Sequence, residues 1–466
     1  MGSKRWRAFG SAALVLALVA GACSSDRGNS PNTAAGNNGG GTTTTAATSA
    51  SGKSFGTLPS PCGPGNSKGA TDKGLTANSV VIGYGDDAGF SLSPGLSHET
   101  SDAIKAMVKW CNAQGGINGR QIDARYYDAA ITNVVNAMTQ ACAQDFMLVG
   151  EAWALDSNQE QTRLGCQLPA VPTYSVSPEF ANAPLTYQAV PNPADVFASG
   201  NAIQVAKLFP DEVKKSAVMF GNFSATQDTK NKVLEAYPKY GFKFLGCPQE
   251  YPINGVADWK PYIQKLKDCG AQVVYYSGQA YPNLQNTLDD AAQLNYHPIW
   301  LTDSNNYLQS FAQWNKSGNG DKVYIRSAFV PFEGAKAGSA TQQYEDIVKA
   351  NNGDISQLGE QATSSFLLWA TAASKCETLT RKCVLDELAK IHKWDGGGLH
   401  AETDPGGNMP AECSVLLKLD GTTWKQVVPT KAGDYDCEPD GSFKLTGPVV
   451  AQAQLNADRI STKFQQ

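Results

Sequence analysis

Strands and helices alternate along most of this chain, and the alternation predicts an α/β fold with parallel sheets. Short apolar segments such as 79–84 and 146–150 have the length of buried strands, and stretches with helical spacing follow them after short loops. The same pattern begins again past residue 195. About 400 residues are expected to be ordered, which exceeds one typical core. We therefore expect two α/β lobes of similar size.

The first set of elements starts near residue 74, where we expect order to begin. Ile104, Met107 and Cys111 share one face of a predicted helix, and Gly115 with Gly116 ends it. The other elements follow from the same reasoning. Predicted strands are 79–84, 121–127, 146–150 and 170–174, and predicted helices are 99–114, 133–144 and a short one ending at 167.

The second set repeats this order and ends in a hairpin. Asp420 and Gly421 lie between two apolar runs, 416–419 and 424–428, which is a strong hairpin signal. A long helix over 360–373 precedes them. The remaining predicted helices are 197–208, 229–240, 259–269 and 282–293, and the remaining strands are 215–220, 242–246, 271–276 and 299–301.

The first 23 residues have the layout of a secretory signal. A basic head precedes an apolar run over 8–20 that is short for a membrane span, and Ala20-Gly21-Ala22 leads to Cys23. A cysteine directly after the cut resembles a bacterial lipoprotein signal, in which the thiol receives the lipid. The same triplet also satisfies the ordinary A-x-A cleavage rule, and Ala20 stands where lipoprotein signals usually carry Leu. The cysteine count favours the lipoprotein interpretation.

The chain has eleven cysteines, and Cys23 is the odd one. An exported protein with ten further cysteines is expected to pair them, although free buried thiols are the alternative. The candidate pairs are ranked by how close the two cysteines lie along the chain, and the pair named last has the least support. The candidate disulfides are Cys376–Cys383, Cys413–Cys437, Cys247–Cys269, Cys142–Cys166 and Cys62–Cys111. No C-x-x-C occurs and the chain has four His, so we expect no metal and no cofactor.

Residues 24 to about 60 are rich in Ser, Thr, Gly, Asn and Ala and cannot bury much apolar surface. They predict a flexible tether of roughly 35 residues with a reach of about 30 Å, which suits an anchored domain.

The mature chain is expected to be mildly acidic. Removing the signal takes away three of the 38 basic residues and none of the 43 acidic residues, which leaves 35 basic against 43 acidic residues and a net charge of −8. This charge argues against a nucleic-acid partner.

The segment 110–120, Trp-Cys-Asn-Ala-Gln-Gly-Gly-Ile-Asn-Gly-Arg, with Asp128 after the next strand, resembles the type I periplasmic solute-binding proteins. These are the leucine/isoleucine/valine and amide-binding receptors of ABC importers. The segments 258–276 and 330–332 and the hairpin at Asp420-Gly421 are also similar to that family, so the resemblance covers roughly residues 78 to 430. It implies two Rossmann-like lobes joined by three crossovers, with a solute held between them.

The resemblance places the crossovers near 188–196, 324–333 and 400–415. It divides the chain into a signal peptide at 1–22, a lipid-anchored tether and lead-in at 23–73, a first lobe, a second lobe and a polar C-terminal tail at 448–466. The first lobe comprises 74–190 and 330–402, and the second comprises 191–329 and 403–447. The protein is expected to be a monomer on the outer face of the cell membrane, with an ABC permease as partner.

Loops after strand ends supply the candidate site, because ligands of open α/β sheets lie beyond the carboxyl ends of the strands. In the family, the loops matching 151–157 and 174–179 hold an amino-acid carboxylate with hydroxyl and backbone N–H groups. Here Ala154 and Val176 replace two of the expected hydroxyls, which speaks against that arrangement. A carboxylate matching Asp303 pairs with the ligand's ammonium in the family. The candidate ligand-binding residues are Phe90, Trp153, Asp156, Ser157, Tyr174, Ser175, Phe223, Ser224, Gln279, Tyr281 and Asp303.

Each candidate also has a plainer interpretation. Trp153, Tyr174 and Phe223 fit ordinary packing under loops, and Asp303 and Ser175 fit caps of the following turns.

Catalysis has little support, since no G-x-S-x-G, H-E-x-x-H or Walker loop occurs. The sequence therefore favours a lipid-anchored solute receptor of an ABC importer. The alternative is a sensory module of the same fold that reports a ligand to a membrane signalling partner.

Overall fold

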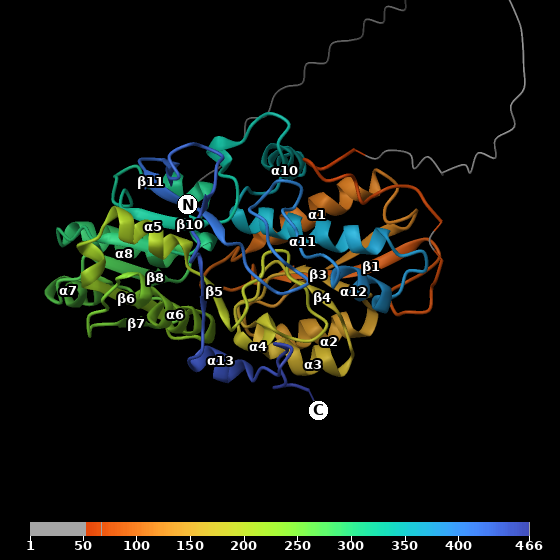
Figure 1. Cartoon of the computed structure of the whole chain (residues 1–466), viewed down its shortest axis with the longest axis horizontal. Helices are drawn as coiled ribbons and strands as arrows, with labels where there is room; N and C mark the ends of the chain where they lie inside the picture. The colour runs from red at the N-terminus through yellow and green to blue at the C-terminus, as the bar shows by residue number, and fades with distance from the viewer. Residues whose placement is uncertain (1–52, 67, 466) are drawn as a thin grey trace, which may run out of the picture. The chain divides into compact units, whose positions relative to one another are not determined.

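The structure, a computed structural model, describes residues 53–66 and 68–465 (Figure 1). The predicted signal peptide at 1–22, the candidate lipidation site Cys23 and the predicted tether up to residue 52 lie outside the described residues. No helix in the described part is both long and apolar enough to span a membrane.

Two main sheets form the framework, and each defines a lobe. The first sheet is entirely parallel; its spatial order is β2 (Gln121–Asp128), β1 (Ser79–Asp86), β3 (Met147–Glu151) and β4 (Ala170–Val171). The second runs β12 (Thr423–Val428), β11 (Cys413–Asp420), β10 (Val323–Ser327), β9 (Ile299–Thr302), β8 (Val273–Ser277), β6 (Ser216–Gly221) and β7 (Gln249–Tyr251), with β13 (Asp436–Cys437) beside β11. Its strands from β7 to β10 are parallel, while β11 and β12 are antiparallel. A separate pair joins β5 (Val196–Ala198) to β14 (Ser442–Lys444). The predicted α/β fold with parallel sheets is confirmed.

Helices cover the faces of both sheets. The α-helices of the first lobe are α1 (His98–Asn112), α2 (Val134–Gln144), α3 (Glu160–Gly165), α4 (Pro178–Ala181), α10 (Ala340–Lys349), α11 (Gln357–Ser374) and α12 (Arg381–Leu388). Those of the second are α5 (Gly200–Leu208), α6 (Ser224–Ala236), α7 (Lys260–Asp268), α8 (Gln285–Gln293) and α9 (Gln309–Trp314), and α13 (Pro448–Ala453) follows near the C-terminus. Shorter turns are η1 (Asp156–Gln159), η2 (Glu212–Lys215), η3 (Tyr237–Tyr240), η4 (Ala280–Leu284), η5 (Ser304–Asn306) and η6 (Phe332–Gly334).

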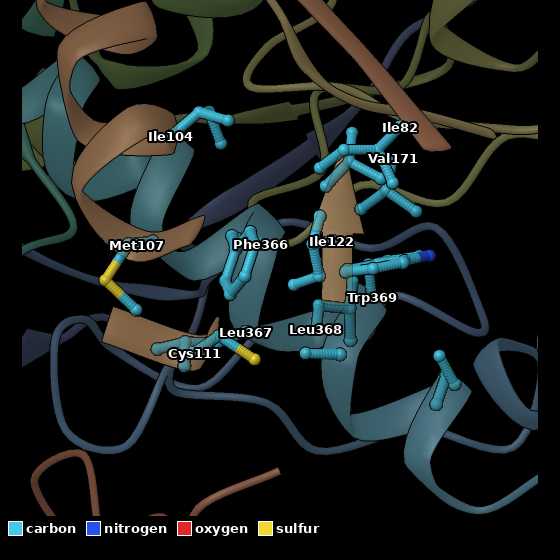
Figure 2. Packing of buried hydrophobic residues seen from close by; sticks show 14 of the residues in the cluster. Ile82, Ile104, Met107, Cys111, Ile122, Val171, Phe366, Leu367, Leu368 and Trp369 are labelled. Atoms are coloured by element: carbon cyan, nitrogen blue, oxygen red, sulfur yellow. The ribbon is translucent and has the colours of Figure 1, made fainter. Parts of the chain in front are cut away.

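The core of the first lobe lies between its sheet and two long helices, α1 and α11, which pack side by side (Figures 1 and 2). Figure 2 shows Met107 and Cys111 of α1 facing Phe366 and Leu367 of α11. Nearly every side chain of α11 is buried, including Trp369 at 0% exposure. Phe366, Leu367 and Leu368 are also 0% exposed, and fully burying a Leu or Phe side chain stabilises the fold by about 1.5–3 kcal/mol, so this helix is central to the lobe.

Three crossovers join the lobes, as the resemblance implies. The chain leaves the first sheet between β4 and β5, returns between β10 and α10, and leaves again between α12 and β11. The bridge between Phe329 and His400 places two of these segments next to each other.

The described cysteines form five disulfides. They join Cys62–Cys111, Cys142–Cys166, Cys247–Cys269, Cys376–Cys383 and Cys413–Cys437, the same pairs that the sequence suggests. All ten cysteines from Cys62 onwards are therefore used.

Packed structure begins earlier and ends later than predicted. Phe55, inside the predicted tether, is fully buried in the core of the first lobe, and the disulfide of Cys62 ties the lead-in to α1. The predicted polar tail contains α13, whose Val449 and Ala453 are fully buried. A few apolar side chains in polar segments are enough to dock them, and composition averages over long stretches conceal these side chains.

Two elements of the second lobe also differ from the prediction. Only Phe244 of the predicted strand 242–246 forms a bridge to Ser216, and the strand β7 starts after Cys247 and Pro248. The start of the predicted helix 197–208 is instead strand β5, because β14 pairs with it from a distant part of the chain. Both differences come from partners that local patterns do not reveal.

Candidate solute-binding cleft

A cavity of about 250 Å³ lies where loops of both lobes and the crossovers meet. Its wall includes residues that follow β1, β3 and β4 of the first sheet and β6, β8 and β9 of the second. These are the carboxyl ends of parallel strands, where α/β proteins usually bind ligands. The volume lies just below the range of roughly 300–1,000 Å³ for small-molecule pockets, so the cavity has room for a small molecule only.

Six of the predicted site residues border this cavity. Three come from the first lobe and three from the second, so the two groups face each other across the cleft. They are Phe90, Tyr174 and Ser175, and Phe223, Gln279 and Asp303.

Five predicted site residues do not border it. Trp153 is 1% exposed in the apolar core beside β3, and its indole N–H donates to the Tyr127 carbonyl at 3.3 Å, so its role is packing. Tyr281 is 59% exposed and lies outside the cavity wall. Ser157 lies on the turn η1, and Ser224 is the first residue of α6. The fifth is Asp156.

Buried carboxylates hold the two loops of the first lobe in place. Asp156 is 2% exposed, and it accepts the backbone N–H of Val176 at 2.7 Å and that of Ser177 at 3.0 Å. Asp87 is fully buried and accepts the N–H of Ile131 at 2.6 Å and that of Ala154 at 2.7 Å. Ile131, Ala154 and Val176 all line the cavity, so both carboxylates shape its wall from behind.

Burial raises the pKa of Asp87 to about 6, with its two backbone hydrogen bonds acting in the opposite direction. Burial also raises the pKa of Asp156 to about 8. The sequence pattern suggested no role for Asp87, because it lies beside Asp86 on a loop and its two partners are more than forty residues away along the chain.

Charged groups of the second lobe reach the cavity itself. Asp303 follows β9, and its Oδ1 accepts the hydroxyl of Tyr275 at 2.5 Å. Arg326 lies near the end of β10, and its Nη1 donates to the Ala198 carbonyl at 3.0 Å. Burial raises the pKa of Asp303, although Tyr275, Arg326 and Lys232 lower it.

Lys232 steadies the first crossover behind the cavity. Its Nζ is buried and donates to Asn192 Oδ1 at 3.1 Å and to the Pro193 carbonyl at 2.9 Å, and Asn192 lines the cavity. Burial lowers the pKa of Lys232 to about 8.

The model of the periplasmic binding protein family matches residues 92–423. The chain belongs to this family. Its members bind small solutes outside the cytoplasm and work with ABC permeases. No curated protein sequence matches the chain at a significant level.

Solved structures of periplasmic binding proteins share the fold. LivJ from Streptococcus pneumoniae, a branched-chain amino acid transporter substrate binding protein solved with isoleucine, is 14% identical with a TM-score of 0.62, over 75% of this chain and 98% of its own. A fatty acid ABC transporter substrate-binding protein from Thermomonospora curvata is 14% identical with a TM-score of 0.62, over 82% and 100%. The leucine binding protein LivK from Thermotoga maritima is 13% identical with a TM-score of 0.61, over 74% and 97%. At these identities the likeness shows the type I fold alone.

Within this periplasmic binding protein, sequence reasoning missed several residues of the cleft. Arg326 is the most consequential, because it is a charged side chain at the carboxyl end of an otherwise apolar strand, and that position was a usable signal. Gln357 and Gln361 of α11 also line the cavity, as do Leu96 and Asn305 on loops. The sequence predicts the start of this helix at 360, whereas Ser356 caps it and the helix begins at Gln357, which brings Gln357 into the helix as well.

Proposed function

We propose that this chain is the extracytoplasmic substrate-binding lipoprotein of an ABC importer. It binds a small polar solute, an amino acid, amide or related compound, between two lobes that close on it. The observation that carries this proposal is the cavity whose wall combines loops of both lobes with the crossovers. Rotation about such crossovers brings the two walls together around a solute and excludes water. We infer a binding role rather than an enzymatic one.

The solute class draws support from proteins with the same fold. LivJ is solved with isoleucine, and the Thermomonospora curvata protein is described as a fatty acid ABC transporter substrate-binding protein, which supports a solute that has both a polar and an apolar part. The proposed contacts are the six cavity-lining candidates together with Arg326 and Asn305.

Binding is tested by a thermal-shift screen of amino acids, amides and short-chain carboxylic acids, followed by calorimetry of the positive compounds. A bound solute stabilises the folded state in proportion to the logarithm of its concentration over Kd. We expect a saturable rise in Tm for at least one of these classes. A flat response across all of them would contradict the proposal.

A lipid on Cys23 would keep the receptor beside its permease. The five disulfides account for all ten remaining cysteines of the chain, so Cys23 is available for lipidation. Metabolic labelling with a fatty acid should mark the native protein and leave Cys23→Ser unlabelled. Equal absence of label in both would indicate plain secretion.

A further inference from the structure

One disulfide of this protein lies at the cavity wall. Cys413 is the first residue of β11, at the point where the third crossover enters the second lobe. It borders the cavity together with its neighbours from Pro410 to Ser414. Among the ten described cysteines, Cys413 alone borders the cavity, so its disulfide is the one that can affect the shape of the cleft directly.

The partner of Cys413 belongs to a segment that holds the first crossover. Cys437 lies opposite Cys413 in the antiparallel pair of β13 and β11. A few residues later, β14 pairs with β5, which ends the first crossover and contributes Val196 and Ala198 to the cavity wall. The disulfide therefore ties the second-lobe ends of the first and third crossovers to each other.

The strand pairing around this disulfide is short. β13 pairs with β11 through two residues only, Cys437 with Cys413 and Asp436 with Ser414. Gln204 of α5 adds two hydrogen bonds, from Nε2 to Asp436 Oδ2 at 3.1 Å and to Ser414 Oγ at 3.2 Å. Short two-stranded pairs are marginally stable in water by themselves, so the covalent bond is the main element of this tie.

The disulfide is also accessible to other thiols. Cys437 is exposed and Cys413 is partly buried, whereas each of the other eight described cysteines is buried or partly buried. Exchange begins with the attack of a thiolate on one sulfur of the disulfide, so its rate depends on access. In secreted proteins, exposed disulfides are the labile or regulatory ones.

We propose that Cys413–Cys437 is a redox-active disulfide and that an extracytoplasmic dithiol opens it and loosens the hinge. A thiolate of the dithiol attacks the Cys437 sulfur, which forms a mixed disulfide and releases Cys413 as a thiolate that takes up a proton. The second thiol of the partner loses its proton and attacks the partner's own sulfur in the mixed disulfide, which releases Cys437 as a thiol. The receptor gains two electrons and two protons, and the dithiol becomes a disulfide.

Reduction leaves the two crossovers joined by non-covalent contacts alone. The lobes of the proposed receptor can then change their relative orientation more freely, because two of the three crossovers no longer move as one unit at their second-lobe ends. Strand register keeps the two thiols opposite each other, so an oxidised dithiol can restore the bond by the reverse exchange.

The redox step is tested on the folded native protein without any solute. The protein is equilibrated with increasing dithiothreitol, free thiols are trapped with iodoacetamide, and the alkylated cysteines are mapped by mass spectrometry. We expect Cys413 and Cys437 to be alkylated first. Cys142–Cys166 is the matched comparison, because both disulfides join residues 24 apart and both of its cysteines are partly buried. We expect its reduction to need at least about tenfold more dithiothreitol.

The effect on the hinge is tested by hydrogen exchange with mass spectrometry and by solution X-ray scattering. In the double variant Cys413→Ser, Cys437→Ser, amides of β5 and of the first residues of β11 should exchange faster, and the radius of gyration should rise. Amides of β1 should keep their native rate. The control, Cys142→Ser with Cys166→Ser, should leave β5 as in the native protein. Native protein reduced selectively at Cys413–Cys437 gives the same measurement if the double variant does not fold.

Two results would overturn the inference. Reduction of Cys142–Cys166 at the same or a lower dithiothreitol concentration would remove the redox role of Cys413–Cys437. Native exchange rates in β5 after selective reduction would remove its effect on the hinge. Neither readout uses a solute, so a failed ligand screen, which contradicts the proposed receptor function, leaves both results interpretable.

Discussion

Asp87 shows how one buried side chain can organise a site that it does not touch. Its two oxygens accept N–H groups from two separate loops, and each of those loops supplies a residue of the cavity wall. Because the acceptors are buried, the loops lose their anchor when the carboxylate is removed.

Asp87→Ala should lower the free energy of unfolding by about 2 kcal/mol or more, since two buried N–H groups lose their partner. It should also weaken solute binding, because Ile131 and Ala154 are no longer held. Denaturant unfolding and calorimetry measure the two effects. Asp123→Ala removes an exposed aspartate from β2 and should change neither; native-like stability of Asp87→Ala would contradict this account.

Glu151 should make stability depend on pH. It is 1% exposed, and burial raises its pKa from 4.5 to about 8. The folded state therefore binds a proton more readily than the unfolded state between these two values. The free energy of unfolding should fall as the pH rises through this window, by up to about 1.4 kcal/mol per pH unit for this group. Below the pKa of 4.5, both states hold the proton, and Glu151 should add no pH dependence.

Glu151→Gln should flatten the decline in Tm between pH 5 and pH 8, because the amide does not titrate. Glu250→Gln changes an exposed glutamate on β7 and serves as the control. If the native protein and Glu151→Gln show parallel curves of Tm against pH, Glu151 does not carry the effect.

At the scale of elements, the lead-in before β1 is part of the fold. Phe55 is buried in the core of the first lobe, Gly397 accepts the Thr57 N–H, and Cys62 is bonded to Cys111 of α1. The segment thus joins α1 to the loop before the third crossover.

Replacing both Cys62 and Cys111 by Ser should cost about 4 kcal/mol, the loop-entropy expectation for a closed loop of 49 residues. Unfolding by denaturant measures the loss, and the shorter loop of Cys376–Cys383, with a separation of 7, should cost less when it is removed. Non-reducing peptide mapping should recover all five pairs. An unchanged unfolding midpoint in the double variant would show that the lead-in is held by packing alone.

At the scale of the whole described structure, the C-terminal segment 446–463 connects both lobes and the crossovers. The Glu235 carboxylate of α6 accepts the N–H groups of Thr446 and Gly447, and Lys463 pairs with Glu179 of α4. Arg459 donates to both oxygens of Asp195, at 2.6 and 2.9 Å, and to the Gly407 carbonyl at 2.7 Å.

Burial would raise the pKa of Asp195, but Arg459 lowers it overall. The contribution of this pair to stability is therefore complete above about pH 4, the ordinary aspartate value, and is lost as the pH falls through the lower pKa of the folded state.

Deleting residues 446–466 should let the lobes separate more widely, because ties to both lobes and to two crossovers are lost together. We expect a larger radius of gyration by solution X-ray scattering in the absence of solute, and a lower Tm. Deleting 464–466 alone removes none of the bonds named above and should leave both values close to native. An unchanged radius of gyration in the longer deletion would show that the crossovers alone set the opening.

The α/β alternation and the Asp420-Gly421 hairpin could be predicted because each depends on neighbouring residues or on simple periodicity. Four of the cysteine pairs join residues no more than 24 apart along the chain, whereas Cys62 and Cys111, 49 residues apart, were the two that remained. The six cavity-lining candidates were found by one rule, that ligands lie beyond the carboxyl ends of parallel strands. That rule gives the loop but not the direction of its side chains, so Trp153 and Tyr281 were selected although one lies in the core and the other faces outwards.

The sequence by itself determined the α/β alternation, the doubling into two lobes and the family resemblance, because these are properties of local pattern. Only the tertiary structure decided which charges meet in the cleft. Arg326 and Asp303 become neighbours through strand register, and Asp87 finds its partners through loops far away along the chain. The chemistry of the cleft is set by such long-range contacts, which no local window of sequence contains.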